Sequence, residues 1–310
     1  MVWIIVAAAL AVIYFGACFF ASSKFVEILS HPRKHSYEEV LSNEAQMRLM
    51  DKAAYDAVPK KDFSVQSSRG YTLQGRILLQ PDWEKSEKKK VIVLCHGWTS
   101  NSVEVCGYYK IYYDKGFNCV LYDHRYHGHS GGDFCSMGYY EHKDLEEVCV
   151  YARTVFGNDC ILGIMGESMG AATVMLATPE IPNLAFTVED CGYSSLEDEI
   201  VYVGTKKYHV PKWPVREWVI AMMKKRMGYD VNDVRPMDAV ARSENVPMLF
   251  VHGDNDHFVP SKMMMECYNK KKGFRMCRYF EGSEHARSHM DHPAEYEKTV
   301  WEFLEKIGVI

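Results

Sequence analysis

The pattern of apolar and polar residues changes along the chain, and its first segment has no polar face at all. Between Val2 and Ala21 no side chain is charged, and apolar residues dominate. About twenty such residues match the roughly 30 Å hydrocarbon thickness of a bilayer at 1.5 Å per helical residue. A helix of this length in a soluble core normally keeps one polar face. The pattern predicts a membrane-anchoring helix over residues 1–23.

A cleavable signal peptide is the main alternative for this segment. Ala21 and Ser23 offer a weak cleavage site, but no Lys or Arg precedes the apolar stretch, whereas signal peptides begin with a positively charged region. The basic residues Lys24, Arg33 and Lys34 all follow it, which slightly favours a cytoplasmic catalytic domain by the positive-inside rule. We therefore expect a retained single-pass anchor, with the opposite orientation left open.

The next segment, residues 24–61, is mostly polar and contains apolar positions at irregular helical intervals. These positions are Val40, Leu41, Met47, Leu49 and Met50. The spacing predicts a juxtamembrane connector of one or two helices that leads to a catalytic domain at 62–310.

From residue 62 onward the periodicity becomes that of strands. Segments 63–66 and 71–77 alternate apolar with polar residues, which predicts a β-hairpin with one solvated face. Short apolar runs then recur at 91–95, 118–122, 160–165, 184–188, 248–251 and 276–280. Short strands buried on both faces and separated by helix-length segments imply parallel βαβ units. We predict an α/β fold in which antiparallel opening strands precede a mostly parallel sheet.

Helices are expected between these strands, and one long segment interrupts the regular spacing. The predicted helices are 103–115, 142–155, 169–177, 262–271 and 294–307. Between residues 194 and 246 the chain carries Trp213, Trp218 and several methionines among charged residues, which predicts a helical lid over the sheet edge. Its Trp and Met side chains fit a substrate-facing wall and a small separate core equally well.

Composition excludes several classes of protein. The 310 residues include 36 Lys and Arg against 41 Asp and Glu, a formal net charge of −5, which is unlike the basic surface of a nucleic-acid-binding domain. The ten cysteines include no CxxC pair, so neither a zinc ribbon nor a thioredoxin-like site is predicted. Free thiols in this number mildly favour a reducing compartment.

A candidate nucleophile stands directly after the predicted strand 160–165. The run Gly166-Glu167-Ser168-Met169-Gly170 precedes an alanine-rich helical stretch, which is the strand–turn–helix setting of a nucleophile elbow. Side chains at the two glycines would collide with neighbouring elements in so tight a turn. The turn would raise Ser168 Oγ to the carboxyl edge of the sheet, at the positive end of a helix dipole.

A serine hydroxyl needs a base, and loops after two later strands offer an acid and a base in the order Ser, Asp, His. The loop 252–260 contains Asp254 and Asp256, and the loop 282–286 contains His285. Both loops follow strands of the parallel sheet, so they should lie at the same edge as Ser168.

These segments resemble those of α/β-hydrolase serine esterases and the related prolyl-oligopeptidase-like hydrolases, over most of the chain after Asp62. His96-Gly97-Trp98 is similar to the family's oxyanion segment. Residues 123–131 resemble its D-x-R-x-x-G-x-S loop, and 252–260 resemble H-G-x-x-D-x-x-V-P. The resemblance implies an α/β-hydrolase fold and makes Asp256 the triad acid, with Asp254 as the fallback.

The remaining site residues follow from this assignment. His285 is the expected base, while His289 and His292 are expected at the surface on the way into the last helix. Asp256 would orient the imidazole of His285 and stabilise the imidazolium. The backbone N–H groups of Met169 and Trp98 are the expected oxyanion donors, and the Trp98 side chain either flanks the pocket or simply packs.

A metal site is the competing interpretation of the loop at 123–129. His124, His127 and His129 have ligand chemistry in close spacing, but the Arg and glycines of the loop fit the hydrolase pattern better. Neither a metal nor another cofactor is therefore expected.

The sequence thus indicates a membrane-bound serine hydrolase that cleaves a small-molecule carboxylic ester or thioester through an acyl-serine intermediate. A peptidase acting on short peptides is the nearest alternative, because the same triad serves both reactions. The sequence shows no propeller of the kind found in large oligopeptidases, which favours the esterase. A non-catalytic binding module on the same fold is the third hypothesis.

Overall fold

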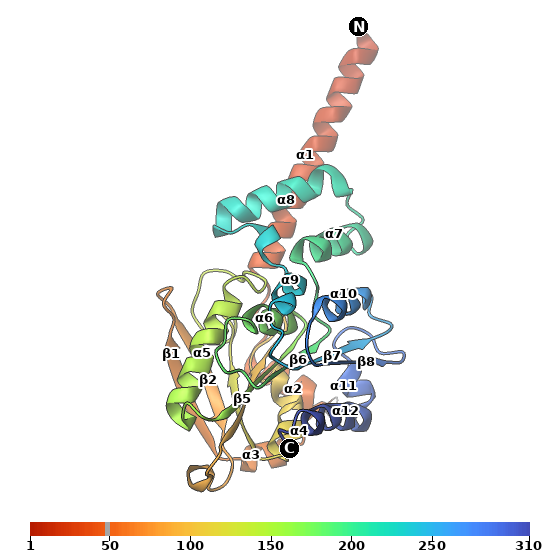
Figure 1. Cartoon of the computed structure of the whole chain (residues 1–310). Coiled ribbons are helices and arrows are strands. Elements are labelled where there is room, and N and C mark those ends of the chain that lie inside the picture. Colours follow the sequence, from red (N-terminus) through yellow and green to blue (C-terminus); the bar gives the residue numbers. More distant parts are fainter. Residues whose placement is uncertain (47–49) are drawn as a thin grey trace.

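An eight-stranded sheet lies at the centre of the structure, a computed structural model that describes residues 1–46 and 50–310, with the backbone alone for 44–46 (Figure 1). Its strands are β1 (Lys60–Gln66), β2 (Thr72–Leu78), β3 (Lys90–Cys95), β4 (Phe117–Tyr122), β5 (Ile161–Glu167), β6 (Phe186–Asp190), β7 (Met248–Gly253) and β8 (Arg275–Phe280). They are arranged in the order β1-β2-β4-β3-β5-β6-β7-β8. β2 pairs antiparallel with both β1 and β4, and the other neighbours pair in parallel. The predicted fold class is confirmed.

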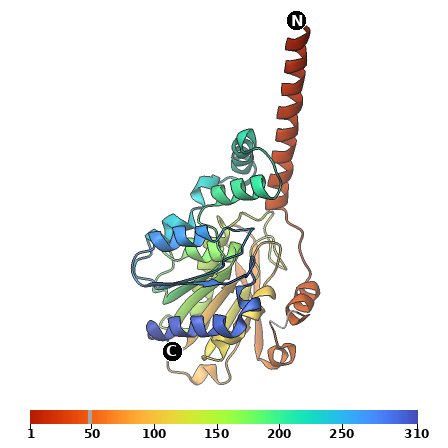
Figure 2. The same ribbon diagram turned by 90° about the vertical axis from the view of Figure 1, so that its right-hand side faces the viewer.

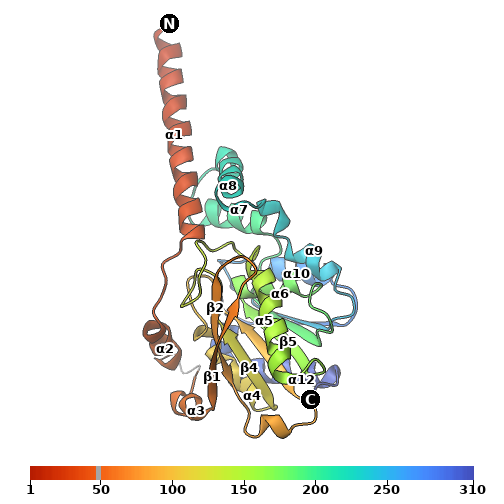
Figure 3. The ribbon, with the colours of Figure 1, turned by 90° about the vertical axis from the view of Figure 1, so that its left-hand side faces the viewer.

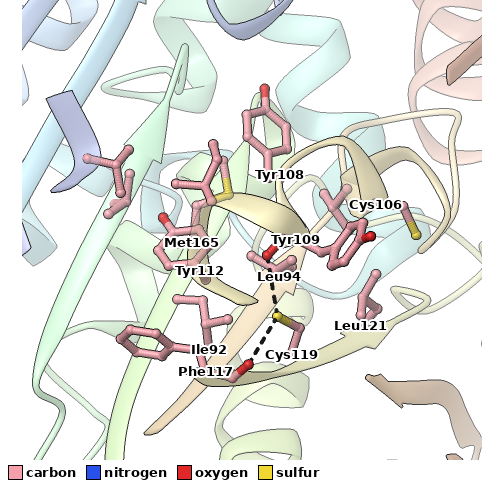
Figure 4. Close-up of a cluster of buried hydrophobic side chains, with 14 of the residues drawn as sticks. Ile92, Leu94, Cys106, Tyr108, Tyr109, Tyr112, Phe117, Cys119, Leu121 and Met165 are labelled. Carbon is pink, nitrogen blue, oxygen red and sulfur yellow. Dashed lines mark hydrogen bonds between the residues drawn. The ribbon is translucent and has the colours of Figure 1, made fainter. Parts of the chain in front are cut away.

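Helices cover both faces of the sheet because its inner strands present apolar side chains alternately to each side. On one face α4 (Tyr109–Tyr113) and α12 (Pro293–Lys306) pack over Ile92 and Leu94, in the cluster that Figure 4 shows in part. On the other face α5 (Glu141–Phe156) and α6 (Met169–Ala177) cover strand residues such as Val91 and Val93, and α10 (Lys262–Lys270) covers β7. Shorter elements are η1 (Trp83–Lys85), η2 (Glu104–Gly107), η3 (Val231–Asp233) and α11 (Ser288–Asp291).

One predicted strand differs from the expectation of burial on both faces. In β8 the residues Cys277, Arg278 and Tyr279 are exposed. The prediction of two-sided burial is wrong for this strand, because β8 lies at the edge of the sheet and pairs with β7 alone. Exposed charged side chains on an edge strand also disfavour pairing with a second chain.

The amino-terminal helix α1 (Val2–Ser30) is one uninterrupted helix that projects from the domain (Figures 1 and 2). It is long and apolar enough to cross a membrane, a property that signal sequences and buried core helices share. Its outer part is almost wholly exposed. Its inner part carries buried side chains, namely Cys18, Ser22, Phe25, Val26, Leu29 and Ser30. The division of the chain at residue 23 remains a prediction, and the helix continues through it.

Two short helices follow α1 along one side of the domain (Figure 3). These are α2 (Tyr37–Gln46) and α3 (Lys52–Ala57), and Val40 and Met50 contribute to the core cluster on the α4 and α12 face. Two apolar positions of the predicted connector, Met47 and Leu49, lie outside the described residues.

Between β6 and β7 the helices α7 (Leu196–Lys206), α8 (Lys212–Met227) and α9 (Pro236–Ala241) lie above the sheet, and α7 and α8 lie beside α1 (Figures 1 and 3). Trp218 and Met223 of α8 pack in an apolar cluster that also contains Phe25 and Leu29 of α1. This arrangement agrees with the expectation of a small core beneath the lid rather than a substrate-facing wall of Trp and Met.

Candidate active site

The turn between β5 and α6 holds Ser168 in a strained conformation. Its φ of 55° and ψ of −114° are rare for a residue with a side chain. A Cβ atom at Gly166 would lie 2.2 Å from the carbonyl oxygen of Gly170, and one at Gly170 would lie 2.2 Å from that of Cys95. Both glycines are therefore required by the close approach of backbones on either side of the serine.

Three side chains from different loops form one hydrogen-bonded line at this turn. Ser168 Oγ lies 2.8 Å from His285 Nε2, and His285 Nδ1 lies 2.7 Å from Asp256 Oδ2. Asp256 follows β7 and His285 follows β8, so the parallel strands bring both to the carboxyl edge where β5 ends. His285 Nδ1 donates to the carboxylate, which leaves Nε2 free to accept from the serine hydroxyl.

Asp256 is buried and accepts four hydrogen bonds. Oδ1 accepts from the backbone N–H groups of Phe258 (2.8 Å) and Val259 (2.9 Å). Oδ2 accepts from His285 and, at 3.1 Å, from His252 Nε2. Burial opposes ionisation, but the hydrogen bonds from His252 and His285 outweigh it and hold the pKa of the Asp256 carboxyl well below its usual range. Asp256 therefore stays charged at all physiological pH values.

His252 and Asp254 support this arrangement without joining the line. Sequence reasoning did not assign a role to His252, although it begins the loop motif and ends the buried strand β7. Asp254 is exposed, and its Oδ1 accepts from the N–H of Gly282 at 2.6 Å, which ties the Asp256 loop to the His285 loop. The structure brings Asp256, and not the fallback Asp254, to His285.

The two later histidines differ from each other. His289 is buried, with 8% of its surface exposed, and its ring lies 4.9 Å from the Tyr108 ring and 5.2 Å from the Tyr296 ring. Burial lowers the pKa of His289 to about 4. The prediction that His289 lies at the surface is wrong, because α11 folds this residue inward against two tyrosines. His292 is half-buried and bonds to the carbonyl of Glu281 at 2.9 Å.

The segment after β3 lies against the serine. His96 Nδ1 donates to the carbonyl of Gly97 at 2.7 Å, and its Nε2 accepts from the N–H of His124 at 2.9 Å. The N–H of Gly97 donates to Glu104 Oε2 at 2.7 Å, so the next backbone donor along the chain is that of Trp98. Trp98 and Met169 both line the pocket that contains Ser168. Their roles as oxyanion donors stay predictions.

The histidine-rich loop folds on its own hydrogen bonds. His127 Nδ1 donates to the carbonyl of Arg125 at 2.9 Å, and Asp123 accepts from the N–H of His129 at 2.9 Å. In the described part of the chain, the group of possible ligands whose atoms lie within 4.8 Å of one another is Cys191, Asp256 and His285. That group is the hydrogen-bonded line itself with a neighbouring thiol, and it does not include the loop histidines.

An apolar pocket opens beside Ser168 and encloses about 550 Å³ of space, part of it open to solvent. Residues of α1, α6, α7 and the loops between elements line it: Phe25, Ile28, Leu29, Trp98, Met137, Ser168, Met169, Tyr193, Leu196, Glu199, Ile200, Val203, Tyr208, Phe258 and Val259.

Glu199 is the one carboxylate in this lining, and its surface is 5% exposed. No partner is found for either of its carboxylate oxygens among the described residues. Burial, with the charge of Asp256 adding to it, raises the pKa of Glu199 well above its usual range. Both effects favour the neutral form of this carboxyl.

A second cavity borders His285, and its lining is mixed and more polar than that of the first pocket. It includes the charged residues Glu104, Glu167 and Arg287 together with His35 from the segment between α1 and α2. His285 lines this cavity and Ser168 lines the apolar pocket, while the two side chains are hydrogen-bonded to each other. The serine–histidine pair thus stands between an apolar and a polar compartment.

Sequence comparisons place the chain among hydrolases. Residues 86–188 match the family model described as serine aminopeptidase, S33. Over 286 residues the chain is 30% identical to YqkD of Bacillus subtilis (strain 168), described as an uncharacterized protein, and the match covers 92% of each chain.

Solved structures share the fold. The chain is similar to the esterase Pf2001 of Pyrococcus furiosus, with a TM-score of 0.68 and 19% identity over 90% of this chain and 97% of that one. It is also similar to the acylaminoacyl peptidase of Pyrococcus horikoshii, with a TM-score of 0.61 and 16% identity over 82% of this chain and 43% of that one. At these identities the likeness shows a common architecture.

Proposed function

The chain belongs to the α/β-hydrolase family of serine hydrolases, and on that premise we propose that it cleaves a carboxylic ester or thioester through an acyl-serine intermediate. The observation that carries the proposal is the continuous line from Ser168 Oγ through His285 to Asp256, with distances of 2.8 and 2.7 Å. These are hydrogen-bond distances suited to proton transfer without rearrangement.

The reaction begins with attack of Ser168 Oγ on the carbonyl carbon as His285 Nε2 takes the hydroxyl proton. The carbonyl oxygen becomes an oxyanion, which accepts hydrogen bonds from the backbone N–H groups of Met169 and Trp98. One such donor contributes about 3–4 kcal/mol to transition-state stabilisation. Collapse of the intermediate breaks the bond to the leaving alkoxide or thiolate, which takes the proton from the His285 imidazolium and leaves an acyl-serine.

Hydrolysis of the acyl-serine repeats these steps with water as the nucleophile. His285 takes a proton from the water, hydroxide adds to the acyl carbon, and the carboxylic acid departs as Ser168 Oγ regains its proton. Asp256 remains ionised throughout, because four donors hold its charge, and it keeps Nδ1 protonated so that Nε2 acts as the base.

The two compartments suggest how an ester lies in the site. The apolar pocket that contains Ser168 suits the acyl chain. The polar cavity on the side of His285 suits the leaving group, because the imidazolium must deliver its proton there.

Aminopeptidase activity is the second candidate, and Glu199 is the observation that favours it. An aminopeptidase must hold the substrate's terminal ammonium near the nucleophile, and Glu199 places an unpartnered carboxyl in the same pocket as Ser168. A bound ammonium would favour the charged form of that carboxyl. The family model that matches residues 86–188 is described as a serine aminopeptidase, which is consistent with this alternative.

Labelling with a fluorophosphonate probe tests the acyl-serine chemistry. We expect the wild type to be labelled and Ser168→Ala to be unlabelled with unchanged folding. Absence of labelling in folded wild-type protein would contradict both candidate functions.

A substrate panel then separates the two candidates. Esterase activity predicts turnover of p-nitrophenyl esters with Glu199→Gln as active as the wild type, since a neutral acid is replaced by a neutral amide of the same shape. Aminopeptidase activity predicts turnover of aminoacyl-naphthylamides, with a rise in KM of at least 10-fold in Glu199→Gln because the ammonium loses its counter-charge.

A further inference from the structure

The last turns of α1 form part of the apolar pocket. Phe25, Ile28 and Leu29 line it together with Ser168. The carbonyl of Leu29 accepts a hydrogen bond from the indole Nε1 of Trp98 at 3.2 Å, so the helix is fixed to the segment that faces the serine. The helix that precedes the domain is thus a wall of its binding site.

The lid fixes α1 on both sides of the weak cleavage site between residues 21 and 23. Ser22 Oγ donates to the carbonyl of Cys18 within α1 at 2.8 Å and also lies 3.4 Å from the carbonyl of Val215, and Arg226 donates to Ser23 Oγ at 3.0 Å. Val26 and Leu29 are buried in the next two turns. Removal of α1 up to this site would cut within a packed helix, so the structure favours retention of the whole helix.

The outer part of α1 and the first turns of α8 present an aromatic and apolar surface. Phe15 packs against Trp213 and Trp218 at ring distances of 5.6 and 6.1 Å, and Phe19 packs against Trp218 at 5.7 Å. Trp213 is 61% exposed. Aromatic side chains of this kind gather where a protein meets the bilayer interface.

Basic residues mark the other end of the same lid helix. Lys224, Lys225 and Arg226 occupy the last turn of α8, beside Ser23, and Lys24 follows on α1. Cations at this level are suited to lipid headgroups. The aromatic and basic groups together favour a membrane interface that lies along α8, between the levels of Phe15 and Lys24 on α1.

The mouth of the pocket lies close to that surface. Ile28 and Tyr208 line the pocket and are 41% and 43% exposed, so they lie where it meets solvent. From Lys24 to Ile28 the helix rises about 6 Å at 1.5 Å per residue. That rise is comparable with the thickness of a headgroup layer.

We propose that α1 is part of the acyl-binding site and that the substrate is an amphiphilic ester of a long-chain fatty acid, taken from the membrane along this helix. The proposal rests on the proposed esterase function. The acyl chain enters between α1 and α7 into the apolar pocket, past Ile28. The polar headgroup occupies the cavity beside His285, which Glu104, Glu167 and Arg287 help to line.

The test compares long and short esters with the full chain in phosphatidylcholine vesicles. We expect Ile28→Trp to lower the ratio of kcat/KM for p-nitrophenyl palmitate to that for p-nitrophenyl butyrate at least 10-fold, because the indole fills the mouth. Ile28→Gln should lower the same ratio without adding bulk, and it suits an exposed helix position. Ile13→Trp, on the outer part of α1 and 66% exposed, is the matched control and should leave the ratio unchanged.

The route through the membrane has its own readout. Wild-type protein should hydrolyse the palmitoyl ester at least 10-fold faster when both share one vesicle than when they are in separate vesicles, while the soluble butyryl ester shows no such difference. Equal rates in the two arrangements, an unchanged chain-length ratio in both Ile28 variants, or a mature protein that begins after Ala21 would each overturn the proposal.

Failure of the proposed function gives a different result. In that case the wild type hydrolyses neither ester and Ser168 is not labelled by a fluorophosphonate. Labelling of each Ile28 variant shows that its nucleophile is intact. A changed ratio of kcat/KM for the long and short esters then reports a change in the acyl-binding site and not a loss of folding.

Discussion

At the residue scale, the candidate site depends on hydrogen bonds that fix charge and tautomer. Asp256 receives four donors and stays ionised, and its bond to Nδ1 of His285 leaves Nε2 free to accept from Ser168. The serine, the acid and the base could be predicted from the sequence, because each of their loops follows a strand and the order of the motifs is fixed. The support from His252 was not readable, since it depends on a contact within a folded loop.

Asp256→Asn tests the acid directly. We expect a loss of about 10⁴-fold in kcat with nearly unchanged folding, because the amide offers a donor to Nδ1 and so favours the wrong imidazole tautomer. The measurement is steady-state hydrolysis of a p-nitrophenyl ester. Asp254→Asn is the matched control and should lose less than about 10-fold, because Asn keeps the oxygen that accepts from Gly282. A larger loss in Asp254→Asn than in Asp256→Asn would reverse the assignment.

His289 predicts a pH dependence of stability. Its pKa is lowered to about 4 by burial, so between about pH 6.5 and 4 the unfolded chain binds a proton that the folded protein does not. Stability contributed by neutral His289 is therefore complete above pH 6.5 and is lost as the pH falls toward 4, by about 3 kcal/mol in all.

The variant His289→Phe keeps an aromatic ring between Tyr108 and Tyr296 and removes the titrating group. As the pH falls from 7 to 4, we expect the wild type to lose about 3 kcal/mol more of its free energy of unfolding than this variant loses. Urea unfolding at several pH values measures the difference between the two proteins, so other titrating groups cancel. Parallel curves would mean that His289 has the same pKa in the folded and unfolded protein, which would contradict the prediction.

At the scale of elements, the spacing of apolar residues predicted the positions of the strands closely. It predicted less well how far each strand is buried. The run 184–188 indicated a strand that the structure places at Phe186–Asp190, which extends over the fully buried acidic residues Glu189 and Asp190. A hydrophobic pattern cannot detect a buried carboxylate. The exposure of β8 follows from its position at the sheet edge, which is a property of topology and not of local sequence.

The elbow between β5 and α6 gives a prediction at this scale. Gly166→Ala places a Cβ atom 2.2 Å from the backbone of Gly170, which cannot move without displacing α6. We expect a loss of about 3 kcal/mol in the free energy of unfolding, at the upper end of overpacking costs, with loss of fluorophosphonate labelling.

Gly204→Ala is the matched control for this substitution. Gly204 lies within α7, and its added Cβ meets Val210 Cγ2 at an ordinary 3.4 Å. We expect this variant to gain about 0.5–1 kcal/mol from helix propensity, as measured by urea unfolding. Equal stabilities of the two variants would mean that the elbow tolerates a side chain.

At the scale of the whole molecule, α1 has an exposed outer part and a packed inner part, and the change occurs near Cys18. Sequence reasoning detected the outer part from its lack of charge. It placed the end of the anchor at residue 23 because the next charged residue is Lys24, and it had no means to detect that Phe25, Val26 and Leu29 pack into the domain. Those contacts join residues nearly 200 positions apart, which no local pattern records.

Two truncated chains test this division. A chain of residues 18–310 keeps the packed turns of α1, whereas a chain of residues 31–310 loses Phe25, Val26 and Leu29, whose burial contributes roughly 1.5–3 kcal/mol each. We expect the shorter chain to be less stable than the longer one by about 5 kcal/mol in urea unfolding. The longer chain should also dissolve without detergent, because the exposed apolar residues before Cys18 are gone. Equal stabilities would mean that α1 only tethers the domain and that the packing of its last turns against the pocket adds nothing to the free energy of unfolding.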